Sequence, residues 1–133
     1  MSDESVQQWH VGRGPQHQAI PTGPLAEVVV GADAGLGLGV VAVTVPAGAA
    51  MPDHAHGGST TLLMPQSGQL RLTDAETGAV TELTPGTLAT IPVGRQVRLE
   101  NAGGDEAQML VVLCPPDFAT AVATWPVAVA AAA

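Results

Sequence analysis

The chain has 133 residues, the size of one domain, and its 46% hydrophobic but only 2% aromatic residues require a core of Val, Leu, Ile, Ala and Met. Four Lys and Arg residues against 12 Asp and Glu give a formal net charge of -8, which would repel a phosphate backbone and excludes nucleic acid as a partner. The polar, acidic start lacks a secretory signal, and the apolar segment 127–133 is far shorter than the roughly 20 residues of a membrane span. We therefore expect a cytoplasmic protein that does not enter a membrane.

The N-terminal segment, residues 1–25, is polar and rich in proline, and it carries two histidines, His10 and His17. Its composition differs from that of the rest of the chain, in which short apolar runs begin at Ala26. We expect this segment to be an arm that pairs along an edge of the fold or lies on a neighbouring subunit.

Residues 26–116 show short apolar runs interrupted by Gly, Pro, Asp and Asn, without apolar stretches of helical period. Turn-forming residues at 74–78, where Gly78 would take a positive φ, and at 101–105 predict antiparallel neighbours. The run 109–113 is apolar enough to be buried on both faces. This pattern predicts an all-β fold, a single-domain antiparallel β-barrel. The predicted strands are 26–31, 36–45, 60–64, 69–73, 79–83, 87–91, 96–100 and 107–113.

The C-terminal segment, residues 117–133, follows two consecutive prolines and ends in alanines. We predict a short helix over 117–124 with Asp117 as its N-cap and with Phe118 and Val122 facing inward, followed by a tail.

Two histidines separated by one residue, His54 and His56, carry the main chemical signal. On a strand this spacing sends both imidazoles to the same face, so two nitrogen ligands converge. Imidazole suits Zn, Fe, Mn, Cu or Ni, although two such ligands hold a divalent ion only weakly without further donors. Either histidine is also a candidate general base, because the unperturbed pKa of histidine lies near neutrality.

The residues around this pair have a regular spacing. Gly48 is followed by five residues and then by His54. Four residues separate His56 from Thr61, and six separate Thr61 from Gly68. In a second block, five residues separate Gly86 from Pro92, Gly94 follows, and Asn101 lies seven beyond it. These blocks resemble the two conserved motifs of the cupin superfamily, which implies a small cupin-like jelly roll, also called a double-stranded β-helix. We expect the glycines and Pro92 to form tight turns and the Asn101 side chain to close a turn by bonding to backbone.

The resemblance is incomplete at the metal ligands. Thr61 stands where cupins usually carry a glutamate, and Val97 stands where they carry a third histidine. A divalent metal (Fe, Mn, Ni or Zn) would therefore be weakly held by His54 and His56, unless water, a substrate, or His10 or His17 from an arm exchanged in a homodimer completes the shell. We expect Thr61, Leu63, Val97 and Leu99 to line a pocket beneath the histidines, with Arg95 as a candidate for steering an anionic ligand.

Two functions follow from the resemblance. The first is a small-molecule-transforming protein with a two-histidine metal site completed by substrate, of the dioxygenase, isomerase, lyase or decarboxylase type. The alternative is a non-catalytic small-molecule-binding module with no tightly bound metal. The missing ligands weigh against the first and favour the second.

Overall fold

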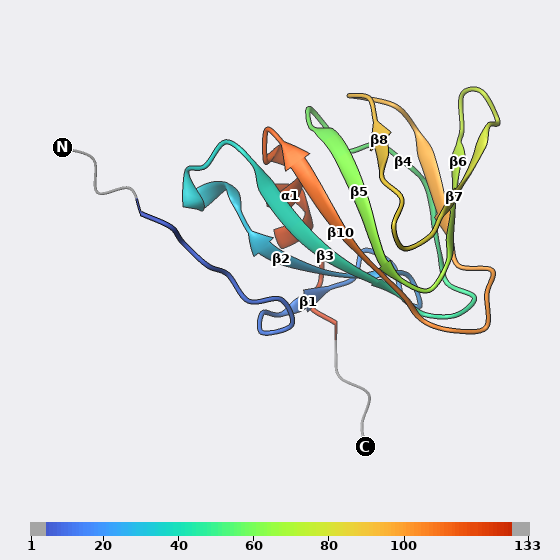
Figure 1. Cartoon of the computed structure of the whole chain (residues 1–133), viewed down its shortest axis with the longest axis horizontal. Helices are drawn as coiled ribbons and strands as arrows, with labels where there is room; N and C mark the ends of the chain where they lie inside the picture. The colour runs from blue at the N-terminus through green and yellow to red at the C-terminus, as the bar shows by residue number, and fades with distance from the viewer. Residues whose placement is uncertain (1–4, 129–133) are drawn as a thin grey trace, which may run out of the picture.

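The computed structural model describes residues 5–128, which form ten strands in two antiparallel sheets (Figure 1). One sheet has the strand order β1-β2-β3-β10-β5-β8, and the other has the order β4-β9-β6-β7. The all-β antiparallel architecture predicted from the sequence is confirmed. The elements are β1 (Gln16–His17), β2 (Leu25–Val30), the 3-10 helix η1 (Ala32–Ala34), β3 (Gly39–Val45), β4 (Ala50–His54), β5 (Thr60–Ser67), β6 (Leu70–Asp74), β7 (Val80–Leu83), β8 (Ala89–Ile91), β9 (Val97–Glu100), β10 (Ala107–Cys114) and α1 (Asp117–Ala123).

The core lies between the two sheets and is built from alternate residues of each strand. In β10, Met109, Val111 and Leu113 are buried between the sheets, whereas Leu110 and Val112 on the other face are half-buried. The prediction that 109–113 is buried on both faces is therefore wrong. Leu110 and Val112 lie on the outer face of the six-stranded sheet, and the described residues cover this face only partly.

Two strands were not predicted. β4 contains Pro52 and Asp53, which have low strand propensity, but it is an edge strand, and its pairing with β9 shifts register between Met51 and His54. Edges and bulges are the places where a sheet tolerates proline, because no ladder hydrogen bond is lost there. β1 is only two residues long and pairs with β2, which fulfils the expectation that the N-terminal segment pairs along an edge.

The predicted strand 36–45 begins later than expected, at Gly39. The segment before it contains η1 and then Gly37, whose φ of 74° lies in the left-handed region and interrupts an extended chain. Elsewhere the observed strands differ from the predicted ones mainly at their ends, and β5 continues through Pro65 to Ser67. Proline is tolerated there because the pairing of β5 with the short strand β8 stops at Leu63.

The turns follow the sequence closely. Gly48, Gly68, Gly78, Gly86 and Gly94 all have positive φ, as tight turns require. At Gly68 a side chain is also excluded by space, because an added Cβ would lie 2.8 Å from the backbone of Ala107.

The side chain of Asn101, which is 2% exposed, bonds to three backbone groups in two segments of the chain. Its Nδ2 donates to the carbonyls of Val45 at 2.9 Å and Asp105 at 2.8 Å, and its Oδ1 accepts from the Gly103 N–H at 3.0 Å. The predicted turn closure by this side chain is confirmed.

Helix α1 packs against β2, β3 and β10, and its residues Ala119 and Val122 are buried. Asp117 is the first helical residue and not the N-cap, which is Pro116 and has no capping side chain. The hydroxyl of Ser59 accepts the Phe118 N–H instead, at 3.3 Å, so a residue distant in sequence supplies the cap. The part of the predicted tail beyond residue 128 lies outside the described residues. Within residues 5–128, no helix has the length and hydropathy needed to span a bilayer.

Candidate functional site

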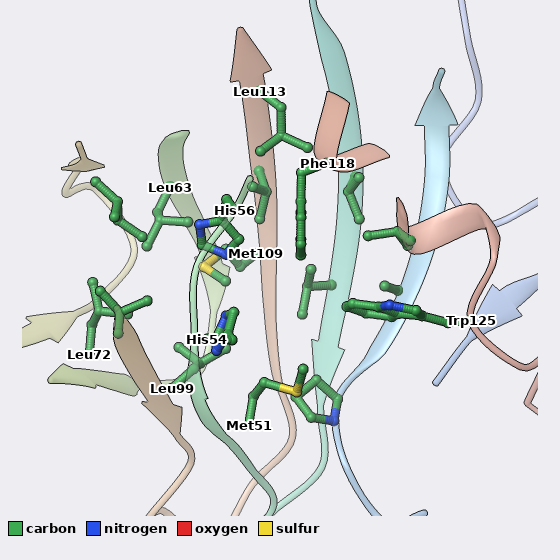
Figure 2. Close-up of a pocket in the computed structure, with 18 residues that line it drawn as sticks. Met51, His54, His56, Leu63, Leu72, Leu99, Met109, Leu113, Phe118 and Trp125 are labelled. Carbon is green, nitrogen blue, oxygen red and sulfur yellow. The ribbon is translucent and has the colours of Figure 1, made fainter. Parts of the chain in front are cut away.

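The two sequence-predicted histidines meet at the cavity between the sheets. His54 is the last residue of β4, and His56 lies two residues further, in the segment that leads into β5. Figure 2 shows both rings directed into the cavity, with their centroids 4.9 Å apart and their planes at 77°. The structure thus brings the two imidazoles to one place, although only His54 belongs to a strand.

A hydrogen bond at Nδ1 orients each ring. Nδ1 of His54 lies 2.8 Å from the Pro52 carbonyl, which can only accept, so this nitrogen carries the proton and Nε2 keeps a lone pair. Nδ1 of His56 lies 3.2 Å from the Thr61 hydroxyl, which can donate or accept, so Nε2 of His56 can be either a donor or an acceptor. No hydrogen bond from residues 5–128 reaches Nε2 of either ring. Both Nε2 atoms are therefore free to meet a ligand.

Burial keeps both imidazoles neutral at physiological pH. It lowers the pKa of His56 to about 4, with a smaller contribution from the neighbouring His54. Burial also lowers the pKa of His54, although the hydrogen bond to Pro52 and the charge of Asp53 oppose the shift. Neutral imidazole is the form that binds metals and that makes one donor and one acceptor available.

The cavity around the imidazoles is otherwise apolar and small, with a free volume of about 60 Å³. Leu63, Val97 and Leu99 line it as the sequence suggested, whereas Thr61 is fully buried behind His56 and reaches the cavity only through that ring. The eighteen lining residues are Pro24, Ala26, Val41, Val43, Met51, His54, His56, Leu63, Leu72, Ile91, Val97, Leu99, Met109, Val111, Leu113, Phe118, Val122 and Trp125.

Two aromatic side chains from the C-terminal segment complete the wall. The ring of Phe118 contacts His56 edge-on at a centroid distance of 4.6 Å, and Trp125 contacts Phe118 at 5.8 Å (Figure 2). Phe118 faces inward, as the sequence predicts, whereas the place of Trp125 at the site was not predicted. A signal was present, because the chain has only one Phe and two Trp, and a large ring in so aromatic-poor a protein needs a specific place.

The donor set does not fit a resident divalent metal. Among residues 5–128, no group of three or more His, Cys, Asp or Glu side chains could hold a metal ion. His17, the nearer of the two arm histidines in sequence, is held by β1 with its Nδ1 2.9 Å from the Trp125 carbonyl, and neither it nor the exposed His10 lines the cavity. His54 and His56 alone leave at least two positions of a four-coordinate ion unfilled.

Arg95 lies apart from the cavity. Its guanidinium forms ion pairs with the carboxylates of Asp74 and Glu76, the latter at 3.2 Å, and it is not among the residues that line the cavity. The hydrogen bond to Asp74 and the two carboxylate charges raise the pKa of Arg95. Although desolvation opposes the shift, hydrogen bonds from the Glu76 N–H and from Arg95 hold the pKa of Asp74 below its usual range. Because Arg95 lies outside the cavity and is paired with two carboxylates, its position does not support a role in steering an anionic ligand.

The comparisons with known proteins agree with this geometry. The family model of the cupin domain matches residues 41–113, which is more than half of the chain. Comparison with curated proteins gave no match.

Solved structures similar to this chain share its fold. A cupin 2 conserved barrel domain protein from Salinispora arenicola has 15% identity and a TM-score of 0.68, with 91% of this chain and 98% of that chain covered. A predicted oxalate decarboxylase from Thermotoga maritima has 14% identity and a TM-score of 0.70, with 82% and 99% covered. A double-stranded β-helix protein from Klebsiella pneumoniae has 22% identity and a TM-score of 0.63, with 71% and 79% covered.

Proposed function

The chain belongs to the cupin family, and on that premise we propose that its barrel binds a small molecule at His54 and His56 without a resident divalent metal. The observation that supports this proposal is that two polar imidazoles face a cavity whose other walls are almost entirely apolar. They are the only titratable side chains among the eighteen residues that line the cavity. An apolar cavity with a few convergent polar groups is the usual form of a small-molecule site.

The hydrogen-bonding state of the rings indicates the chemistry of the ligand. Nε2 of His54 is an acceptor, and Nε2 of His56 becomes a donor when the Thr61 hydroxyl donates to its Nδ1. A single group that both donates and accepts, such as a hydroxyl or a protonated carboxyl, would satisfy both rings. The rest of the ligand would be hydrocarbon, because the remaining walls are almost entirely apolar.

Size and charge restrict the ligand further. The cavity volume of about 60 Å³ is far below the roughly 300–1,000 Å³ of pockets that hold drug-sized ligands. The cavity therefore suits a small molecule. Oxalate, which the name of one similar structure mentions, is a poor candidate here, because no Arg or Lys lines the cavity to balance its two charges.

Binding fits the imidazoles better than acid–base catalysis does. A general base works best when its pKa lies near the operating pH. With a pKa of about 4, His56 stays neutral at pH 7 and is a weak base. The pKa of His54 is also lowered. We therefore assign the pair to ligand recognition.

A ligand-observed NMR screen of small alcohols and carboxylic acids, made on untagged protein, tests the proposal. We expect binding to wild type and loss of binding in the His54→Ala/His56→Ala variant. His10→Ala is the matched control, because it removes an exposed histidine outside the cavity. Binding that survives in the double variant would contradict the assignment to these rings.

Elemental analysis of the same preparations tests the absence of a resident divalent metal. We expect Fe, Mn, Ni and Zn far below one per chain in wild type. Near-stoichiometric metal in wild type that the double variant lacks would overturn this part of the proposal, and would support a metal site completed by substrate.

A further inference from the structure

Thr61 is a residue of β5 that is 0% exposed. Among residues 5–128, its hydroxyl has one hydrogen-bond partner, Nδ1 of His56, at 3.2 Å. A hydroxyl carries one proton, and a buried donor left without an acceptor is costly. Nδ1 of His56 is the acceptor that this proton can reach, so the proton is paired only if the hydroxyl donates. The Thr61 hydroxyl is therefore the donor in this bond.

The direction of this bond fixes the tautomer of His56. Burial lowers the pKa of His56 to about 4, so at physiological pH the ring is neutral and carries a single proton. When Nδ1 accepts, that proton is on Nε2, and Nε2 becomes a donor in a ring that points into the cavity (Figure 2). In the other tautomer the unpaired proton would be that of the Thr61 hydroxyl, which does not line the cavity and which no ligand reaches.

His54 has the opposite tautomer. Its Nδ1 lies 2.8 Å from the Pro52 carbonyl, which can only accept, so the proton of this ring is on Nδ1 and Nε2 is an acceptor. The two rings, whose centroids are 4.9 Å apart, thus present one donor and one acceptor to the same apolar cavity. Two lone pairs would repel each other in such a low-dielectric space, whereas a donor beside an acceptor does not. The pair of rings is therefore complementary to a group that both accepts and donates.

We propose that Thr61, by fixing the tautomer of His56, restricts this site to neutral groups that accept and donate at once: a carboxamide, a hydroxyl or a protonated carboxyl. A ketone or an ether only accepts, so it leaves Nε2 of His54 without a partner. A carboxylate also only accepts, and no Arg or Lys lines the cavity to balance its charge. The inference rests on the proposed function, because it requires ligands to bind at both rings. It goes further by naming Thr61 as the residue that decides which polar groups bind.

Long-range ¹H–¹⁵N correlation spectra of ligand-free protein test the tautomers. Protonated and unprotonated imidazole nitrogens differ strongly in ¹⁵N shift, and the variants His54→Gln and His56→Gln assign the signals. We expect the proton of His56 on Nε2 and the proton of His54 on Nδ1. A His56 that carries its proton on Nδ1 would overturn the inference. Because this measurement needs no ligand, its outcome is independent of the proposed function.

Chemical-shift titrations with four probes of similar size test the selection of polar groups. Propan-2-ol and acetone differ mainly in whether the oxygen donates, and acetamide and acetate differ in the donor and in charge. We expect the first member of each pair to bind at least about fivefold more tightly, because the second leaves the acceptor of His54 unpaired in the cavity. Equal affinities within both pairs would overturn the selection and leave the proposed function standing. Binding of none of the four probes would contradict both.

Thr61→Val tests the role of the hydroxyl, because it removes this group and keeps the branched shape of the side chain. We expect His56 to lose its single tautomer in this variant, and propan-2-ol to lose its advantage over acetone. Thr61→Ser keeps a hydroxyl and should keep both properties. Thr60→Val is the matched control, because the neighbouring Thr60 is exposed, and it should behave as wild type.

An unchanged tautomer and unchanged selection in Thr61→Val would overturn the role of Thr61. If this variant does not fold, the spectra of wild type still decide the tautomer of His56, and a Thr61→Ser protein with a different tautomer would overturn the role of the hydroxyl.

Discussion

The ring of Phe118 lies edge-on against the imidazole of His56, with centroids 4.6 Å apart and planes at 72°. This contact joins helix α1 to the segment between β4 and β5 and makes the C-terminal part of the chain a wall of the site. The position of Phe118 depends on Ser59, which is 1% exposed. The Ser59 hydroxyl accepts from the Phe118 N–H at 3.3 Å and donates to the Pro115 carbonyl at 2.6 Å.

Replacement of Ser59 by alanine should therefore destabilise the protein and loosen the site. The change leaves two partly buried backbone groups, the Pro115 carbonyl and the Phe118 N–H, without their partner, which costs about 0.5–1.5 kcal/mol per bond in the free energy of unfolding. Urea unfolding measures this loss. Ser67→Ala, at the exposed end of β5, is the control and should change stability by less than about 0.5 kcal/mol. Equal stability of Ser59→Ala and wild type would contradict the role given to this hydroxyl.

Stability should fall as the pH drops from about 6.5 to about 4. Burial lowers the pKa of His56 from 6.5 to about 4, so the unfolded chain binds more protons than the folded chain in this window. Neutral His56 contributes fully to stability above its pKa in the unfolded chain. This contribution is lost as the pH falls through its pKa in the folded chain. At about 1.36 kcal/mol per pKa unit, the shift corresponds to a loss on the order of 3 kcal/mol for metal-free protein.

Thermal unfolding of metal-free wild type and His56→Gln across this range measures the effect. The variant should show a clearly smaller loss of stability, with the remainder due to His54, whose pKa is lowered in the same direction. His10→Gln should behave as wild type, because His10 is exposed. A pH profile that is the same in wild type and His56→Gln would show that His56 is not held neutral by burial.

Asn101→Ala should be among the most destabilising single substitutions. The Asn101 side chain satisfies the carbonyls of Val45 and Asp105 and the N–H of Gly103, and alanine leaves these groups without partners. We expect a loss of about 2–4 kcal/mol from one or two buried groups left unpaired. Denaturant unfolding with Gln108→Ala, an exposed position on β10, provides the comparison. A loss no larger than that of the control would contradict the structural role of Asn101.

The outer face of the six-stranded sheet predicts a homodimer. At the edge of this face, Glu27 lies opposite Ala42 and accepts hydrogen bonds from the Gly12 and Gly14 N–H groups. Cross-strand neighbours in the middle of the face are apolar, with Val112 between Val40 and Leu62, and Leu110 between Ala42 and Met64. These side chains are half-buried in one chain and carry no charge. A solvated sheet face normally carries polar residues, and an apolar face of this kind marks an interface. We therefore propose that a second copy of the chain covers it.

Light scattering after size exclusion tests this proposal. Wild type should have the mass of two chains, and Leu110→Glu should have the mass of one, because a buried carboxylate without a partner opposes association. Gln108→Glu adds the same charge beside the apolar face and should stay dimeric. A monomeric wild type would overturn the proposal.

The sequence by itself determined the β architecture, the turns and the histidine pair. Tight turns need residues such as Gly48, Gly86 and Gly94 at positive φ, and this requirement is local, so it can be read without the fold. The same holds for the spacing of His54 and His56. Strand β4 was missed because Pro52 and Asp53 oppose a strand locally, and only its place at a sheet edge makes them acceptable.

Only the tertiary structure decided what surrounds the histidines. The contacts of His56 with Phe118 and Thr61, and the pairing of Arg95 with Asp74 and Glu76, join segments distant in sequence, and no local pattern encodes such neighbours. The same is true of His17, which β1 and the Trp125 carbonyl hold outside the cavity wall, and of Met109, whose inward phase on β10 places it in that wall. Side-chain chemistry depends on which groups share a low-dielectric space, and the packing of the two sheets sets that space.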